Sequence, residues 1–173
     1  IWKPASISGK PYVTPDYGEN WYYCEGISYG AKVIADRVNP KTFYATCEGT
    51  FYISTDGGYH FEPTGAILTD NSVLTAVGDK GHVWAATGGS IMYTEDGGKN
   101  FTVLKTINAK ALGFGAPEKE GGYMTIYVMG NDNVSGNDTP HGDGIYRSTD
   151  KGKTWVRLND DNHLFGNLTY SIT

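Results

Sequence analysis

Short runs of β-branched and aromatic residues alternate along this chain with turn-forming residues. The first clear set of four runs is Lys32–Arg37, Thr42–Cys47, Thr50–Ser54 and Phe61–Thr64, and Asn-Pro, Glu-Gly and Asp-Gly-Gly sequences separate its members. Runs of this length and composition predict strands joined by tight turns. We find no apolar stripe with the 3.6-residue period of an amphipathic helix. The pattern therefore predicts an all-β protein.

The same set of four runs occurs twice more. The second set is Val73–Val77, His82–Ala86, Ser90–Thr94 and Phe101–Lys105, and the third is Lys110–Gly115, Tyr123–Val128, Gly144–Ser148 and Trp155–Leu158. Four strands in a unit of about 40 residues are typical of a β-propeller blade. At the ends, Ile1–Lys3, Tyr12–Thr14 and Trp21–Cys24 predict the last three strands of one blade, and Leu168–Thr173 predicts the first strand of another.

We therefore expect residues 1–173 to form a single β-propeller segment of about four four-stranded blades. It comprises a partial blade at 1–25, blades at about 31–64, 73–105 and 110–158, and the first strand of a further blade at 168–173. If the last strand joins the first three, the chain closes a small four-bladed ring. Otherwise both ends are open edges, and the remainder of a propeller or a second protein chain must cover them.

One motif, S/T-x-D-x-G-x-x-aromatic, recurs four times, starting at positions 14, 54, 94 and 148. The steps of 40, 40 and 54 residues indicate one repeated unit whose last copy carries an insertion of roughly 14 residues. The segment Gly130–Gly144 has no apolar periodicity and predicts that insertion as a loop.

Folding alone explains the spacing within this motif. The Asp carboxylate can accept backbone N–H bonds across its own turn, the Gly supplies a positive φ, and the aromatic ring packs between strands. Ca²⁺ is a poor fit, since it takes about 6–8 oxygen ligands and each hairpin offers one carboxylate. The motif resembles the Asp-box of sialidases, sortilin-type receptors and several glycoside hydrolases. The predicted structural residues are Asp16, Gly18, Trp21, Asp56, Gly58, Phe61, Asp96, Gly98, Phe101, Asp150, Gly152 and Trp155.

Composition excludes several classes of function. The net charge is −5, and the 14 basic residues form no stripe for phosphates, so nucleic acid is not an expected partner. No apolar run approaches the roughly 20 residues of a membrane helix, so no membrane partner is expected. Cys24 and Cys47 predict two separate buried thiols. His141 and His163 lack metal-ligand spacing, so we expect no metal and no cofactor.

In a propeller, the hairpins between strands 3 and 4 share an end with the loops between strands 1 and 2, and ligand sites are expected at the opposite end. Sugars are bound by aromatic faces combined with planar polar groups. The candidate substrate-binding residues in the loops of that end are Tyr29, Asp132, Asp138, His141, Asp143, Asp160, Asp161, His163 and Phe165. The adjacent pair Asp160 and Asp161 is a poor acid and base pair, because glycoside hydrolysis needs carboxyls about 5–9.5 Å apart.

Three long segments carry a resemblance to a known family. They are AKVIADRVNPKTFY at 31–44, GTFYISTDGG at 49–58, and GIYRSTDKGKTWVRLNDDNHLFG at 144–166. The chain resembles the C-terminal part of glycoside hydrolase family 74, over nearly its whole length. The combination of ADRVNP with WVRxNDDxHx(aromatic)G, in that order, is more specific than the repeated hairpins.

The resemblance implies a secreted, inverting endo-β-1,4-glucanase that degrades xyloglucan and is built as two seven-bladed propellers around an open cleft. This chain would form part of the second propeller and one wall of the cleft. The family's two catalytic Asp residues precede the matching segment, so no catalytic residue is assigned here. Two features depart from the family. The Gly-rich strand pair that follows the family segment is absent, and the insertion at 130–144 is longer than expected.

Two other classes of Asp-box protein remain as alternatives. A non-catalytic propeller could recognise a protein partner, although the cysteine-rich modules usual in such receptors are absent. A sialidase would need an arginine cluster, and arginine occurs only at 37, 147 and 157. The resemblance favours the xyloglucan-degrading enzyme over both.

Overall fold

The computed structural model spans residues 1–173 and describes residue 1 and residues 9–69, 72–132, 143–160 and 162–163. Its strands are joined by turns and irregular loops, and no helix occurs in these ranges. The same ranges accordingly contain no long apolar helix of the kind that spans a membrane. The all-β prediction is confirmed.

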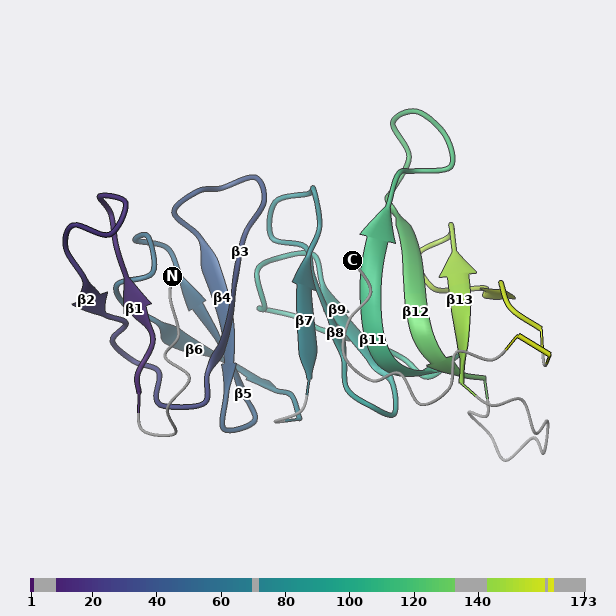
Figure 1. The fold of residues 1–173 in the computed structure, drawn as a ribbon, viewed down its shortest axis with the longest axis horizontal. Coiled ribbons are helices and arrows are strands. Elements are labelled where there is room, and N and C mark those ends of the chain that lie inside the picture. Colours follow the sequence, from purple (N-terminus) through teal and green to yellow (C-terminus); the bar gives the residue numbers. More distant parts are fainter. Residues whose placement is uncertain (2–8, 70–71, 133–142, 161, 164–173) are drawn as a thin grey trace. The chain divides into compact units, whose positions relative to one another are not determined.

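The strands of the described residues form one two-stranded and three four-stranded antiparallel sheets, and neighbours within each sheet follow chain order (Figure 1). The small sheet consists of β1 (Tyr12–Val13) and β2 (Tyr22–Tyr23). The first four-stranded sheet consists of β3 (Lys32–Ala35), β4 (Phe43–Cys47), β5 (Thr50–Ser54) and β6 (Glu62–Ile67). The second consists of β7 (Val73–Ala76), β8 (Val83–Ala86), β9 (Ile91–Thr94) and β10 (Thr102–Leu104). The third consists of β11 (Asn108–Gly115), β12 (Thr125–Asn131), β13 (Gly144–Ser148) and β14 (Val156–Arg157).

Each run that the sequence predicts in the three full sets overlaps one observed strand. Three strands extend further than predicted, and one of them, β11, begins two residues early, at Asn108. β6 continues to Ile67, which pairs with Thr50, and β12 continues to Asn131, which pairs with Asn108. The runs predicted at Ile1–Lys3 and Leu168–Thr173 lie outside the described residues, apart from Ile1.

The chain divides into two compact units. Unit 1 comprises residues 1–83 and 94–101, and unit 2 comprises residues 84–93 and 102–173. One core of unit 1 is formed by Val13, Cys24, Ile27, Ala31, Ala45, Cys47 and Phe61. Both thiols are free and buried, as the sequence predicts, and burial raises the pKa of Cys24 to about 11.

Aromatic packing around Trp84 forms part of the core of unit 2. Trp84 is fully buried in β8, and its indole stacks on the Tyr93 ring with 4.3 Å between ring centroids. Its Nε1–H donates to the Tyr123 hydroxyl at 2.9 Å, so the polar edge of the buried indole is satisfied.

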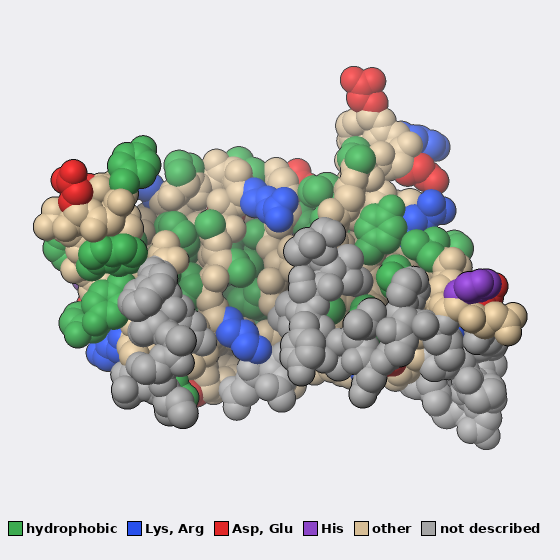
Figure 2. All heavy atoms as spheres, viewed as in Figure 1, with side chains coloured by type: hydrophobic (Ala, Val, Ile, Leu, Met, Phe, Trp, Pro, Cys, Tyr) green, Lys and Arg blue, Asp and Glu red, His purple; other side chains and the backbone are tan. Residues whose placement is uncertain are grey.

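Exposed apolar side chains gather over β1 and β2 on the face that Figure 2 shows. Trp21, Tyr22 and Tyr23 are each about half exposed, and Tyr17 is fully exposed. In a two-stranded sheet there is little surface against which such rings can pack, which explains their exposure.

Candidate functional site

The connections between strands lie at two ends of the sheets in unit 1, and hydrogen bonds show which connections share an end. The Gly57 N–H donates to the Lys41 carbonyl at 2.8 Å, which joins the β5–β6 connection to the β3–β4 connection. The Gly97 N–H donates to the Gly81 carbonyl at 3.0 Å, which joins the two corresponding connections of the next sheet. We call this the turn end, and the opposite end the loop end.

The four repeated motifs adopt one hydrogen-bonded turn, which we call the aspartate turn. In the second copy, Asp56 Oδ1 accepts bonds from the Tyr59 N–H at 3.0 Å, the His60 N–H at 3.1 Å and the Ser54 hydroxyl at 2.8 Å. The Ser54 hydroxyl in turn accepts a bond from the Gly58 N–H at 3.0 Å. Closely similar contacts recur around Asp16, Asp96 and Asp150. Each carboxylate is engaged by its own turn.

These hydrogen bonds keep the carboxylates ionised. For Asp56, burial opposes ionisation, but the bonds from His60, Ser54 and Tyr59 outweigh it and lower the pKa to about 2. The pKa values of Asp96 and Asp150 also lie at about 2, because bonds led by those from Asn100 and Thr154 outweigh the same opposing effect of burial. A carboxyl group with so low a pKa holds no proton near neutral pH and cannot serve as a general acid.

A hollow of about 460 Å³ at the turn end of unit 1 is lined by residues that include Asp36, Tyr44, Lys80 and Asp96. The buried Asp36 carboxylate accepts bonds from the Val38, Asn39 and Gly81 N–H groups and from the Tyr44 hydroxyl. Its hydrogen-bonding capacity is therefore used within the protein, which indicates that Asp36 stabilises the fold.

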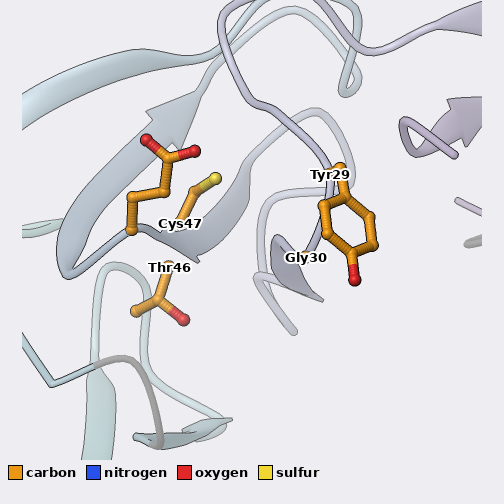
Figure 3. Close-up of a pocket in the computed structure, with 5 residues that line it drawn as sticks. Tyr29, Gly30, Thr46 and Cys47 are labelled. Carbon is orange, nitrogen blue, oxygen red and sulfur yellow. The ribbon is translucent and has the colours of Figure 1, made fainter. Parts of the chain in front are cut away.

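A smaller hollow of about 190 Å³ lies at the loop end of unit 1 (Figure 3). Its lining residues are Tyr29, Gly30, Thr46, Cys47 and Glu48. Tyr29 precedes β3, whereas Thr46 and Cys47 end β4, and Figure 3 shows the Tyr29 ring across the space from them. The Tyr29 side chain is 45% exposed, so its ring is accessible to a ligand. The predicted Tyr29 thus borders a hollow at the predicted end.

Thr46 and Glu48 were not among the residues predicted from the sequence. Glu48 and Gly49 connect β4 to β5, and both have positive φ, 50° and 74°. A two-residue turn of this kind usually has the sequence Asn-Gly or Asp-Gly. The unusual Glu at its first position is the feature of the sequence that could have indicated a functional residue here. The Glu48 carboxylate accepts a bond from the Ser28 hydroxyl at 2.9 Å.

Asp143 is held at the start of β13 in unit 2. A bulge in β11 leaves Lys110 between the paired residues Ala109 and Ala111, and its ammonium group forms an ion pair with the Asp143 carboxylate. The Asn131 amide also donates to Asp143 Oδ1 at 3.3 Å. The candidate residue Asp143 therefore ties β13 to β11 and β12.

Of the remaining candidate substrate-binding residues, some lie within the described residues and others lie outside them. Asp160 and His163 are exposed and bonded to each other, with 2.6 Å between Asp160 Oδ1 and His163 Nδ1. Asp132 is exposed, and its charge adds to the effect of burial in raising the pKa of Tyr146. The candidates outside the described residues are Asp138, His141, Asp161 and Phe165. Among the described residues, no three His, Cys, Asp or Glu side chains are grouped to hold a metal ion.

Four-stranded antiparallel sheets whose strands pair in chain order, together with a turn repeated from sheet to sheet, define a segment of a β-propeller. The solved structure of the GH74 xyloglucanase from Xanthomonas campestris is similar to it, with a TM-score of 0.78 and 30% sequence identity. The similarity covers 90% of this chain and 22% of that structure.

Curated sequences are similar to the chain as well. The chain is 45% identical to the xyloglucanase Xgh74A of Acetivibrio thermocellus, over all of this chain and 20% of that protein. It is 33% identical to the oligoxyloglucan-reducing end-specific xyloglucanase of Emericella nidulans, over 95% of this chain and 21% of that protein. No protein-family model matches the chain. The chain is homologous to GH74 xyloglucanases and spans about a fifth of the length of these relatives.

Proposed function

We propose that residues 1–173 form a single propeller segment of a secreted endo-β-1,4-glucanase that degrades xyloglucan. The segment corresponds to the C-terminal portion of the second propeller and forms one wall of the polysaccharide-binding cleft. The observation that carries this proposal is the 45% identity to a xyloglucanase over the whole chain. Secretion is part of the proposal because the resembled family acts on an extracellular polysaccharide.

Within this enzyme, the aspartate turns are Asp-boxes with an architectural role. Each of their carboxylates accepts bonds from its own turn, and in the three four-stranded sheets the turn follows the third strand. Substrate contacts are assigned to exposed loop residues, which are Tyr29 at the loop end of unit 1 and, in unit 2, Asp132, Asp160 and His163.

The chemistry of the complete enzyme is the inversion that the resemblance implies. One Asp protonates the glycosidic oxygen while a second activates water, with the two carboxyls roughly 6.5–9.5 Å apart. Both lie outside this chain in the resembled family. The low pKa values of Asp56, Asp96 and Asp150 support this assignment, because none of these groups retains a proton to donate. This chain contributes binding and scaffold.

The test is an assay of the intact protein on xyloglucan, with release of reducing ends followed over time. We expect hydrolysis of xyloglucan and inversion of the anomeric configuration in the first product, observed by NMR. Affinity electrophoresis in a xyloglucan gel measures binding separately. An intact protein that neither cleaves xyloglucan nor is retarded by it overturns the proposal.

The alternative of a protein-recognition propeller makes the opposite prediction in the same gel. A protein-recognition propeller is expected to migrate in the xyloglucan gel at the same rate as in a gel without the polysaccharide. Insoluble β-glucan provides a second comparison, because a glucan-binding wall retains the protein and a protein-recognition surface does not.

A further inference from the structure

The floor of the smaller hollow contains a polar atom with no partner in the part of the chain that the structure describes. Thr46 is only 3% exposed, and its hydroxyl oxygen makes no hydrogen bond there. Figure 3 shows this hydroxyl on the side of Thr46 that faces Gly30 and Tyr29. Buried hydroxyls are nearly always hydrogen-bonded, so an unpartnered one that lines a hollow is suited to a ligand.

The rim of the hollow adds acceptors and an aromatic face. The Glu48 carboxylate is exposed beside the hollow, and Ser28 donates to only one of its oxygens, Oε1. Glu48 holds this position in a left-handed conformation that long side chains rarely adopt. Strained residues of this kind cluster at ligand sites, where the side chain itself is needed. The Tyr29 ring lies across the hollow and supplies an apolar surface.

The size of the hollow limits what can enter. Its volume of about 190 Å³ equals that of about six liquid waters and is smaller than the roughly 300–1,000 Å³ of pockets for drug-sized ligands. One small ring fits such a space, whereas an unbranched polymer needs an entrance and an exit. A hydroxyl, a carboxylate and an aromatic face together suit a neutral polyhydroxylated ring, since a carboxylate repels anions.

We infer that the hollow formed by Tyr29, Gly30, Thr46, Cys47 and Glu48 is a binding site for one neutral sugar ring. The Tyr29 ring packs against the sugar, the Glu48 carboxylate accepts hydrogen bonds from its hydroxyl groups, and the Thr46 hydroxyl bonds the group that enters deepest. The class of ligand rests on the proposed function. The ring can be a free monosaccharide or a side branch of a polysaccharide, and these two sources share the same chemistry.

The experiment measures dissociation constants of the intact protein by titration calorimetry with three probes. These are xylose, a xyloglucan oligosaccharide and the unbranched cello-oligosaccharide of equal backbone length. Thr46→Val keeps the side-chain shape and removes only the unpartnered hydroxyl, and Glu48→Asn keeps a residue that tolerates positive φ. We expect both variants to weaken binding of at least one probe about tenfold. The probe that is affected identifies the source of the ring.

Tyr29→Ala tests the role of the aromatic ring, and Tyr17→Ala is its matched control. Both tyrosines are exposed, but Tyr17 lies in the first aspartate turn, so only the Tyr29 variant is expected to weaken binding. If the wild type binds the oligosaccharides and the Thr46 and Glu48 variants match it with every probe, this inference fails and the proposed function stands. If the wild type binds no probe and does not cleave xyloglucan, both fail.

Discussion

Asp36 is a buried carboxylate that connects two strand connections of unit 1. Its Oδ1 accepts from the Val38 and Asn39 N–H groups in its own connection, and its Oδ2 accepts from the Gly81 N–H 45 residues later, at 2.9 Å. Burial opposes its ionisation, but these N–H bonds and the Tyr44 hydroxyl outweigh burial and lower the pKa of Asp36. The charged carboxylate thus joins segments that are distant in sequence.

Removing the Tyr44 hydroxyl tests this arrangement. Tyr44 is 1% exposed, and its hydroxyl donates to Asp36 Oδ2 at 2.7 Å. Tyr44→Phe is expected to lower the free energy of unfolding by about 1–3 kcal/mol, because a buried charged acceptor loses one donor. Urea denaturation measures the change, and Tyr29→Phe, which alters an exposed ring, serves as the control. Equal stability of the Tyr44 variant and the wild type would contradict the role given to Asp36.

The aspartate turns predict how stability depends on pH. Asp56, Asp96 and Asp150 have a pKa of about 2 when folded, below the ordinary value of 3.8 that applies when the chain is unfolded. The unfolded chain then binds more protons in this range, so stability rises with pH. The stabilisation is present above about pH 4 and is lost as pH falls toward 2. Urea midpoints measured between pH 2 and 6 check this, and Asp96→Asn should flatten the profile.

Residues that act within a short segment were predictable from sequence, and residues that act across the fold were not. The bonds of Asp56 all come from residues 54–60, so the motif spacing contains the information. Thr46 and Tyr29 border one hollow although 17 positions separate them, and this proximity follows from the pairing of β3 with β4. A single sequence does not reveal which buried threonine lacks a partner.

At the level of the element, the third aspartate turn depends on a glycine packed against an aromatic ring. Gly98 has a φ of +95°, and a Cβ placed on it would collide with the Phe51 ring. Gly98→Ala is therefore expected to lower stability by about 2–4 kcal/mol, from backbone strain together with overpacking. Gly88→Ala is the matched control, because Gly88 has a φ of +88° with no atom within 4 Å of its Cβ position. Similar losses in thermal unfolding for both variants would contradict the packing argument.

The β4–β5 turn predicts a stabilising substitution. Glu48 has a φ of 50°, a conformation that Asn adopts more readily than Glu. Glu48→Asn is expected to raise the free energy of unfolding by about 0.5–1 kcal/mol, because the turn loses strain. Chemical denaturation checks the change, with Glu62→Asn in β6 as a control that lacks positive φ. A less stable Glu48 variant would show that the side chain supports the fold more than the turn strains it.

Strand positions were predictable and strand ends less so. β6 extends three residues beyond its predicted end at Thr64, and β12 extends into the segment 130–144 that was predicted as a loop. Hydrogen-bonded pairing with the neighbouring strand determines where these two strands end. Ile67 bonds to the start of β5 beyond an irregularity in register, and Asn131 faces Asn108 beyond the bulge at Lys110. Such bulges depend on the partner strand, which local composition does not describe.

At the level of the whole molecule, we propose that the aspartate turns of this chain are structural and that the catalytic carboxylates lie elsewhere in the complete enzyme. The described carboxylates of this chain that have low pKa values are engaged in hydrogen bonds within their own connections or to neighbouring ones. A general acid must carry a proton at working pH, and a general base must reach a water beside the scissile bond. Neither condition is met by a carboxylate that is held inside a turn.

Single substitutions in the intact protein test whether the carboxylates of the aspartate turns are structural and not catalytic. Asp56→Asn, Asp96→Asn and Asp150→Asn are expected to keep kcat on xyloglucan within about twofold of the wild type, because general acid–base catalysis is worth about 10²–10⁴-fold and none of these groups supplies it. Each should unfold at a lower temperature, since its turn loses an ionised acceptor. Steady-state kinetics well below the unfolding temperature, paired with thermal unfolding, separate the two effects. A hundredfold loss of kcat in a variant that remains folded would place a catalytic carboxylate in an aspartate turn.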